Sequence, residues 1–293
     1  QRADEQAQAA RDAAARADEE AALARREAKR ADLESVAAKR EATRADQEAR
    51  LARRETVRGN AVQGYLVDLF SANSNDQKNA VQVRNLTAKQ LLDRGADKLE
   101  GSKSLPEDVN AALYRLFGEL YETVYDLDRS MAMHQRSVQA ASSVYGKASR
   151  EYALALMELA WVARERRSGT PVFDQLDEAK AILARIAPNS DDYAQALYFE
   201  ASFYALTKPE RAVRAAQESL RIMDQNGGSN RRKAFAERSL GYALRAAGDF
   251  RAAADAFSKA ADSFAKLYGA DGVEVGMTRT ILAECLRQEL RMT

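Results

Sequence analysis

Cysteine, histidine and tryptophan each occur once in the 293 residues of this sequence, and proline occurs four times. A single cysteine, Cys285, excludes a disulfide within the chain, and one cysteine with one histidine cannot build a Cys/His metal cluster. No apolar run approaches the roughly 18 residues that a membrane span needs. Lys and Arg number 45 against 44 Asp and Glu, and this balance argues against a general nucleic-acid surface.

Residues 1–58 contain no glycine, no proline and no aromatic residue, whereas all four prolines follow residue 105. Each proline stands between helix-like runs or at the start of one, where its missing N–H does little harm. No alternating β-branched segment is long enough to form a strand. The sequence therefore predicts an all-α protein whose organisation changes near residue 58.

Small residues repeat through the first segment in alternating steps of four and three. The series is 3, 7, 10, 14, 17, 21, 24, 28, 31, 35, 38, 42, 45, 49, 52 and 56, and fourteen of these sixteen positions are Ala. Such spacing is the a/d seam of a heptad, so we expect residues 1–58 to form a coiled-coil rod that pairs two copies of the chain. The alternative is a single solvated helix, stabilised by Ala propensity and by pairs such as Asp46–Arg50.

Residues 59–105 are expected to form connecting helices that dock on the following domain. A richer apolar stripe runs from Val62 to Phe70 at the end of the rod. The polar stretch 71–80 is typical of a turn. Thr87 is expected to cap the next helix, which should end at Gly101.

Residues 106–293 show recurring helix pairs. In "SLGYALRAAGDFRAAADAFSKA", Gly241, Ala253 and Phe257 stand at the spacing of a tetratricopeptide repeat (TPR). In that motif small residues lie where the first helix of a pair meets the second, and aromatic residues fill the holes between repeats. Gly118 and Ala160 occupy corresponding places earlier in the chain. We expect an α-solenoid of about four pairs, closed by a C-terminal capping helix.

No kinase, phosphate-binding or other catalytic motif is present in the chain. His134 occupies the aromatic position of the first pair's second helix, which favours a packed histidine over a catalytic one. Cys285 shares a helix face with Ile281 and Leu282, which favours a buried small side chain over a reactive thiol. The sequence predicts no catalytic residue, no metal and no cofactor, and therefore a chain that is not itself an enzyme.

The candidate ligand-binding residues lie on first helices, at positions that face the groove of a TPR domain. They are Arg115, Glu119, Glu122, Trp161, Arg164, Arg238, Tyr242 and Arg245. Exposed Trp, Tyr and Arg are the side chains that concentrate binding energy at protein interfaces. For Trp161 a plain packing role is an equal alternative. The expected partner is a peptide or a protein, with no nucleic acid.

The run from "RRETVRGNAVQGYLVDLF" through "NLTAKQLLDRGADKLEG" to "LYRLFGELY" resembles the C-terminal sensor region of bacterial transmembrane serine/threonine protein kinases with TPRs. The matching residues are Val57, Arg58, Tyr65, Leu66, Leu69 and Phe70 in the first element, and Leu86, Thr87, Ala88, Leu91, Leu92, Asp93, Arg94, Gly95, Ala96 and Leu99 in the second. Gly64 inside the first element and the long rod before it depart from the family pattern.

This resemblance implies an extracytoplasmic sensor whose kinase domain lies outside this chain. It places the chain on the periplasmic side of the inner membrane, attached only through a segment upstream of Gln1. A ligand would bind in the groove and the rod would report it. The alternative is a stand-alone cytoplasmic adaptor or chaperone, assembled through the coiled coil.

Overall fold

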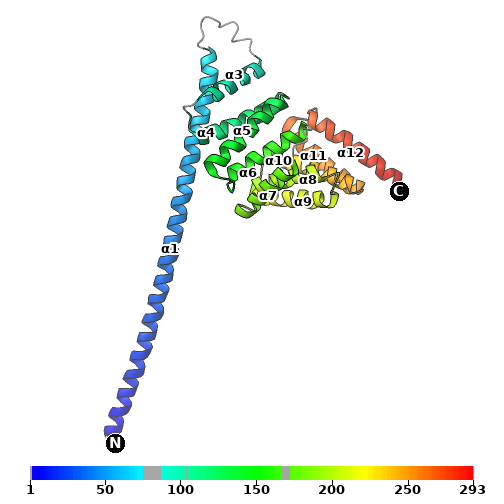
Figure 1. The fold of residues 1–293 in the computed structure, drawn as a ribbon. Helices are drawn as coiled ribbons and strands as arrows, with labels where there is room; N and C mark the ends of the chain where they lie inside the picture. Colours follow the sequence, from blue (N-terminus) through cyan, green and yellow to red (C-terminus); the bar gives the residue numbers. More distant parts are fainter. Residues whose placement is uncertain (1, 75–86, 103–104, 167–171, 293) are drawn as a thin grey trace. The chain divides into compact units, whose positions relative to one another are not determined.

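The computed structural model describes residues 2–74, 87–102, 105–166 and 172–292, apart from the side chains of residues 2–24, 28, 47, 48, 51, 70–74 and 292. Every regular element in these ranges is an α-helix, which confirms the predicted all-α class (Figure 1). The chain divides into two compact units, Gln1–Tyr65 and Leu66–Thr293. This division falls inside the segment 59–105, and the boundaries expected at 58 and 105 stay predictions.

Helix α1 spans Arg2–Ser74 without interruption (Figure 1). All described side chains between residues 25 and 57 are exposed, and Leu33 is 67% exposed. Local ion pairs stabilise this helix, among them the predicted pair, in which Arg50 Nε lies 2.9 Å from Asp46 Oδ2. The side chains of the seam before residue 25, and those of Ala28 and Phe70, lie outside the described residues. So do Leu86 and most of the expected turn at 71–80.

Helix α3 (Ala88–Gly101) begins with the predicted Thr87 cap and ends at the predicted glycine. The Thr87 hydroxyl accepts from the Gln90 N–H at 3.2 Å, and the Gln90 side chain accepts from the Thr87 N–H at 2.9 Å. This reciprocal capping box satisfies two otherwise unpaired N–H groups at the helix start. Leu69, at the end of the apolar stripe, is buried against Gly95 of α3.

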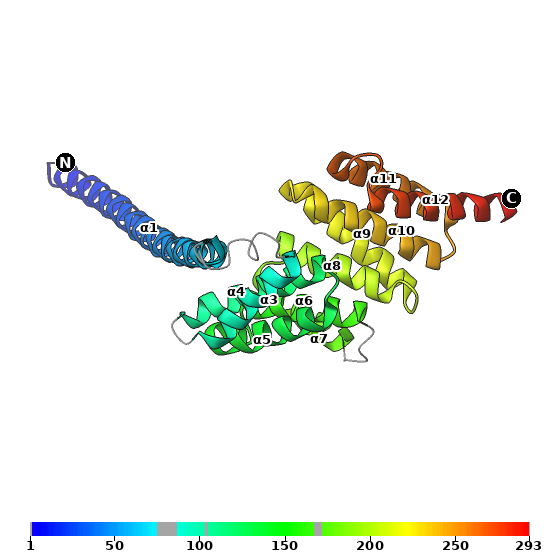
Figure 2. The ribbon, with the colours of Figure 1, turned by 90° about the horizontal axis from the view of Figure 1, so that it is seen from above.

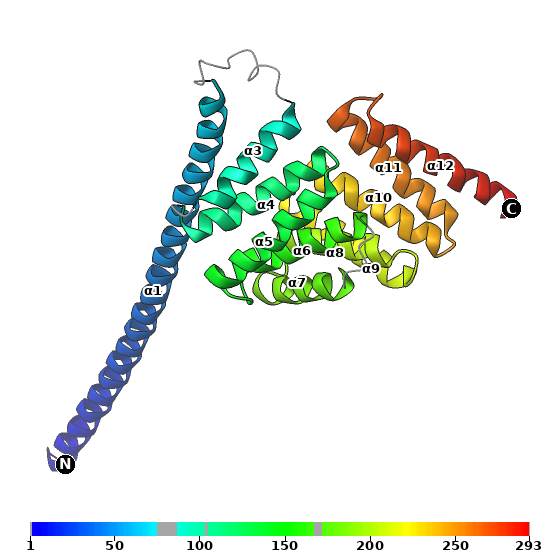
Figure 3. The same cartoon turned by 45° about the horizontal axis from the view of Figure 1, so that its top comes forward.

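Four helix pairs and a closing helix follow, as predicted. The pairs are α4 (Glu107–Thr123) with α5 (Leu127–Tyr145), α6 (Arg150–Glu165) with α7 (Val172–Ile186), α8 (Asp191–Tyr204) with α9 (Pro209–Asn226), and α10 (Asn230–Ala246) with α11 (Phe250–Tyr268); α12 (Val273–Met292) closes the series. Each helix packs on the next one along the chain, and the first helices also contact one another in order. Figures 2 and 3 show this succession running from α3 and α4 at one end to α12 at the other.

The predicted small residues are the contact points between paired helices. A Cβ added to Gly118 would lie 2.6 Å from the His134 ring, and one added to Gly241 would lie 2.8 Å from the Phe257 ring. Ala253 is fully buried. Paired helices can therefore cross closely only because these positions carry little or no side chain. His134 is fully buried in this contact, which confirms its packed role.

In the first and fourth pairs, the turn between the two helices uses a left-handed residue followed by an aspartate cap. Gly248 has φ +87 and precedes Asp249, which caps α11. In the first pair, Tyr125 has φ 58 and precedes Asp126, which caps α5. Left-handed backbone is easy for glycine but strained for tyrosine, so the first turn is less stable than its counterpart.

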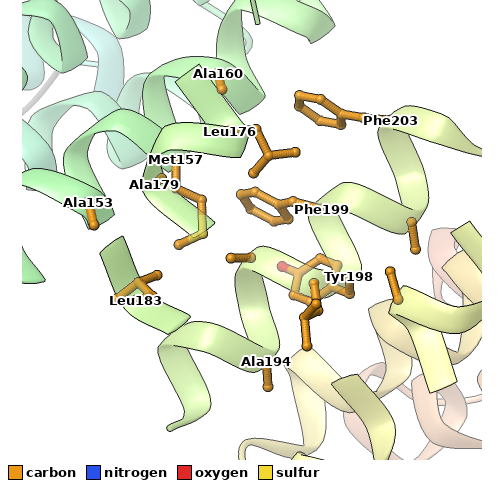
Figure 4. Packing of buried hydrophobic residues seen from close by; sticks show 14 of the residues in the cluster. Ala153, Met157, Ala160, Leu176, Ala179, Leu183, Ala194, Tyr198, Phe199 and Phe203 are labelled. Carbon is orange, nitrogen blue, oxygen red and sulfur yellow. The ribbon is translucent and has the colours of Figure 1, made fainter. Parts of the chain in front are cut away.

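A large core cluster extends from α5 to α10, with many of its members on α6, α7 and α8. In Figure 4, Phe199 of α8 points toward Met157 of α6 and Leu176 of α7, and all three are buried. A smaller cluster near the C-terminal end contains Phe257 and Cys285. Cys285 is fully buried there, as the sequence predicted.

Candidate functional site

The first helices α4, α6, α8 and α10 form a layer, and we call the surface of this layer the A face. All eight predicted ligand-binding residues belong to it, and each of them is at least partly exposed. Arg115, Glu119 and Glu122 lie on α4, Trp161 and Arg164 on α6, and Arg238, Tyr242 and Arg245 on α10. The prediction included no residue of α8, and the structure shows that α8 contributes to this face.

On α4, Arg115 and Glu119 form a loose, exposed ion pair, whereas the Glu122 carboxylate is hydrogen-bonded to α5. Arg115 Nη1 lies 3.8 Å from Glu119 Oε1, and both side chains are about two-fifths exposed, at 40% and 44%. Glu122 Oε1 instead accepts from Nε2 of the buried His134 at 2.9 Å and from the Ser130 hydroxyl at 3.4 Å. Glu122 is therefore anchored to α5, while Arg115 and Glu119 remain available to a ligand.

Glu158 of α6 is a site residue that the sequence prediction missed. Burial raises its pKa to about 7; the charges of Glu119 and Glu122 also raise this pKa, whereas His134 and Arg115 lower it. Its carboxylate Oε1 accepts from the Gln195 side-chain amide of α8 at 3.3 Å. Glu158 stands three residues before Trp161, so an A-face position was readable from helix periodicity, but its burial was not.

Trp161 has the packing role that the sequence offered, and its binding role stays a prediction. Its ring stacks on Phe199 with centroids 4.4 Å apart and on Phe203 with centroids 6.2 Å apart, which joins α6 to α8. The Arg164 guanidinium lies 5.9 Å from the Trp161 ring centroid and donates to the Ser202 carbonyl at 3.1 Å. The tryptophan nevertheless keeps part of its surface in solvent.

On α10, the predicted arginines are engaged by the closing helix. Arg238 pairs with Glu274 of α12, and Arg245 Nη1 lies 3.4 Å from Glu284 Oε2. The Arg238 side chain is only 17% exposed. Its guanidinium carbon lies 4.9 Å from the centroid of the Phe235 ring and 5.0 Å from that of the Phe264 ring. Both arginines already form ion pairs with α12, so the α10 end of the A face offers a ligand fewer unengaged charged groups than the α4 end.

Other parts of the described chain offer less chemistry. Among the described residues, no group of three or more His, Cys, Asp or Glu side chains is placed to hold a metal ion. Burial raises the pKa of the Cys285 thiol, which keeps it protonated and weakly nucleophilic. A shallow hollow of about 490 Å³ lies at the α4–α5 turn, where Lys89 and Arg166 are paired with Asp126 and Asp128.

No protein-family model and no curated protein sequence matches the chain. Solved structures do match. BtubC (BKLC) from P. vanneervenii superimposes with a TM-score of 0.53 at 18% identity, over 76% of this chain and 88% of that one. The TPR-like repeats assigned to a kinesin light chain of P. anserina match with a TM-score of 0.47 at 16% identity, over 69% of this chain and 96% of that one.

The fold is a TPR-like α-solenoid. At this level of identity the likeness establishes architecture alone. TPR-like solenoids present an extended surface of stacked helices that generally binds peptides or proteins. None of the helices in the described ranges has the length and apolarity required to cross a membrane.

Proposed function

We propose that this chain is a non-catalytic protein-interaction module that binds a peptide or protein segment on the A face of α4, α6 and α8. The observation that carries this proposal is the setting of Trp161. It is the only tryptophan, it is held rigidly by two aromatic rings, and it remains partly exposed beside Arg164. A rigid aromatic side chain next to an arginine is the typical centre of a protein interface.

The charge pattern of the A face supports binding at its α4 end. Arg115 and Glu119 are loosely paired and well exposed, whereas Arg238 and Arg245 are engaged by α12. Breaking an intramolecular ion pair to bind a ligand adds a desolvation cost that an open residue does not have. The proposed site therefore centres on Arg115, Glu119, Trp161 and Arg164.

Peptides selected on the full chain from a random linear library test this proposal. Binding should change the fluorescence of Trp161, because the chain has no other tryptophan. Arg164→Ala should weaken binding by about tenfold, the effect of losing an interface hot spot. Arg185→Ala, an exposed substitution on the second helix α7, is the matched control and should leave affinity unchanged. Failure to enrich any peptide would overturn the proposal.

We further propose that the module is the ligand-sensing region of a bacterial transmembrane serine/threonine kinase, on the periplasmic side of the inner membrane. The sequence resemblance around residues 57–99 supports this role, and the uninterrupted helix α1 is suited to carry a signal. A ligand transmits a signal only if it binds two states of the rod with different affinities.

The coding sequence upstream of Gln1 tests the kinase assignment. A kinase domain followed by a membrane-spanning segment is the expected result. A start codon close to Gln1 would instead favour a cytoplasmic adaptor or chaperone assembled through α1. Either result leaves the interaction role of the A face to be tested by the peptide experiment.

A further inference from the structure

Helix α12 repeats the features of a first helix, but no second helix packs after it among the described residues. It packs on α11, at the end of the succession of pairs (Figure 3). Thr278 of α12 stands 42 positions after Ala236 of α10, and both are fully buried. Cys285 stands 42 positions after Ala243, and both are also fully buried. The same register therefore relates the two helices along their length.

On α10, three residues form the stripe that α11 covers. Gly241 receives the Phe257 ring, and Ala234 is fully buried in one apolar cluster with residues of α11. Between them, Glu237 is only 8% exposed and its carboxylate Oε2 accepts from the Ser263 hydroxyl of α11 at 2.7 Å. Two small residues thus admit the packed side chains of α11, and a polar contact between them sets its position.

The corresponding residues of α12 are open to solvent. They are Gly276, Arg279 and Ala283, and all three are exposed. Nothing lies within 4 Å of the Cβ that Gly276 lacks. Leu286 and Leu290 continue the series and are 46% and 78% exposed. These five residues follow one another in steps of three and four along one side of α12, and we call them the outer stripe.

The outer stripe carries positive charge without a matching carboxylate. Arg279 within the stripe and Arg287 beside it are exposed, and neither forms an ion pair with another described residue. Glu274 and Glu284 of the same helix are engaged by arginines of α10. Where α10 has a glutamate under α11, α12 has Arg279, and covering an arginine without a partner is costly. A helix that covers this stripe should therefore bring an acidic side chain.

We propose that the outer stripe docks an acidic amphipathic helix of a partner protein, in the place of the second helix of a fifth pair. This helix presents large apolar side chains to Gly276 and Ala283 and a carboxylate to Arg279. Burial of Leu286 and Leu290 contributes to affinity, and the charge-assisted contact fixes the register. The surface contains none of the residues assigned to the A-face site, so this inference goes beyond the function proposed above.

A synthetic peptide with the sequence of α11, Phe250–Tyr268, is a suitable probe because α11 covers the equivalent stripe of α10. One peptide carries Ser263→Glu, which supplies the carboxylate for Arg279, and the other keeps Ser263. A staple on the solvent-facing side holds both peptides helical. The substituted peptide should bind the full chain, and the unsubstituted one should bind about tenfold more weakly for want of the charge-assisted contact. Exchange with the chain's own α11 would give the opposite order, because the added carboxylate would meet Glu237.

Variants of α12 then locate the contact. On Arg279→Gln the two peptides should bind equally. On Ala283→Leu both should bind about tenfold more weakly, because the larger side chain fills the space that the docked helix needs. Both positions are exposed, so urea unfolding of these variants should match that of the unaltered chain. Arg214→Gln, an exposed substitution on α9, is the matched control and should preserve the preference for the substituted peptide.

Equal affinity of the two peptides for the unaltered chain, or no binding of the substituted peptide, would overturn the proposal. So would a preference that survives in Arg279→Gln, since the peptide would then lie elsewhere. Analytical ultracentrifugation of Leu290→Asp examines a second copy of the chain as the occupant. The mass should equal that of the unaltered chain at each concentration. A lower mass would show that a second copy covers the outer stripe, in place of the proposed partner.

Discussion

Single residues that lack a side chain hold the repeats together. Gly118 receives the His134 ring and Gly241 receives the Phe257 ring, and in each case a methyl group would overlap the ring. Glycine normally weakens a helix by about 1 kcal/mol relative to alanine. At these two positions the close crossing outweighs that loss. Gly64 of α1 is different, because nothing lies within 4 Å of the Cβ it lacks.

Gly241→Ala is therefore expected to destabilise the repeat domain by about 1–3 kcal/mol, the cost of overpacking a filled core. Urea unfolding followed by Trp161 fluorescence measures this change. Gly64→Ala is the matched control, and it should not lower that stability because its methyl group meets nothing. Equal effects of the two substitutions would show that the crossing at Gly241 is not tight.

Glu158 makes the stability of the protein depend on pH. Its pKa is raised from 4.5 to about 7 in the folded chain, mainly by burial. Between these values the folded state holds a proton that the unfolded state has released, so stability falls as pH rises through this window. The charged and titratable groups facing it are Arg115, Glu119 and Glu122 of α4, His134 of α5 and Tyr198 of α8.

Glu158→Gln should remove this penalty. The variant is expected to be more stable than the unaltered chain by about 2–3 kcal/mol above pH 7, and about equal to it near pH 4. Urea unfolding of both proteins across this range measures the difference. A difference that does not grow with pH would show that Glu158 is as well solvated as an ordinary glutamate.

At the level of elements, the closing helix depends on α10 and α11. Helix α12 packs on α11, and its Glu274 and Glu284 pair with Arg238 and Arg245 of α10. Its outer side exposes large apolar residues, of which Leu290 is 78% exposed. The ion pairs therefore fix the direction of a helix that has no second helix after it in the described residues.

A double-mutant cycle of Arg238→Gln and Glu274→Gln should give a coupling free energy of about 1–2 kcal/mol, since the pair is mostly shielded from water. Faster amide exchange in α12 should accompany each single substitution. The exposed pair Arg221–Glu218 within α9 is the control and should show little coupling. Coupling in the α12 pair no larger than in the control would mean that apolar packing alone holds the closing helix.

At the level of the whole molecule, the chain combines two units with different sources of stability. The unit Leu66–Thr293 has buried clusters of its own, whereas α1 shows only exposed side chains between residues 25 and 57 where they are described. Helices gain most of their stability from packing, so an alanine-rich helix of this length gains from a partner helix. An Ala seam buries little area, and the resulting association should be weak.

We therefore predict that the full chain forms a dimer that dissociates on dilution. Replacing Ala17, Ala24 and Ala31 together by Asp should shift the mass found by analytical ultracentrifugation to that of the monomer, because a charge in the seam is costly to bury. Replacing Gly64 by Ala is the control and should leave the mass unchanged. A monomeric mass for the unaltered chain at every concentration would establish α1 as a single solvated helix.

The sequence predicted on which helix face many of the candidate site residues lie, but not which of them are buried or held in ion pairs. Helix periodicity placed Arg115, Glu119 and Trp161 on the A face, because a residue's side of a helix follows from local spacing. The same spacing gave no sign that Arg238 and Arg245 are engaged by residues more than thirty positions away, at 274 and 284. Glu158 was not predicted as a site residue because glutamate side chains are mostly exposed to water. Here the neighbouring helices shield it, and that shielding raises its pKa.

The sequence by itself determined the helices, their caps, the succession of pairs and the close crossings at glycine and alanine, because each follows from residues a few positions apart. Only the tertiary structure decided which A-face groups have hydrogen-bond or ion-pair partners and which are left without one. Whether a side chain finds a partner depends on how neighbouring helix pairs stack. Gln195 of α8, for example, donates to Glu158 of α6, and its own side-chain oxygen has no partner. Stacking sets the distances between side chains on different helices, and local spacing carries no information about it.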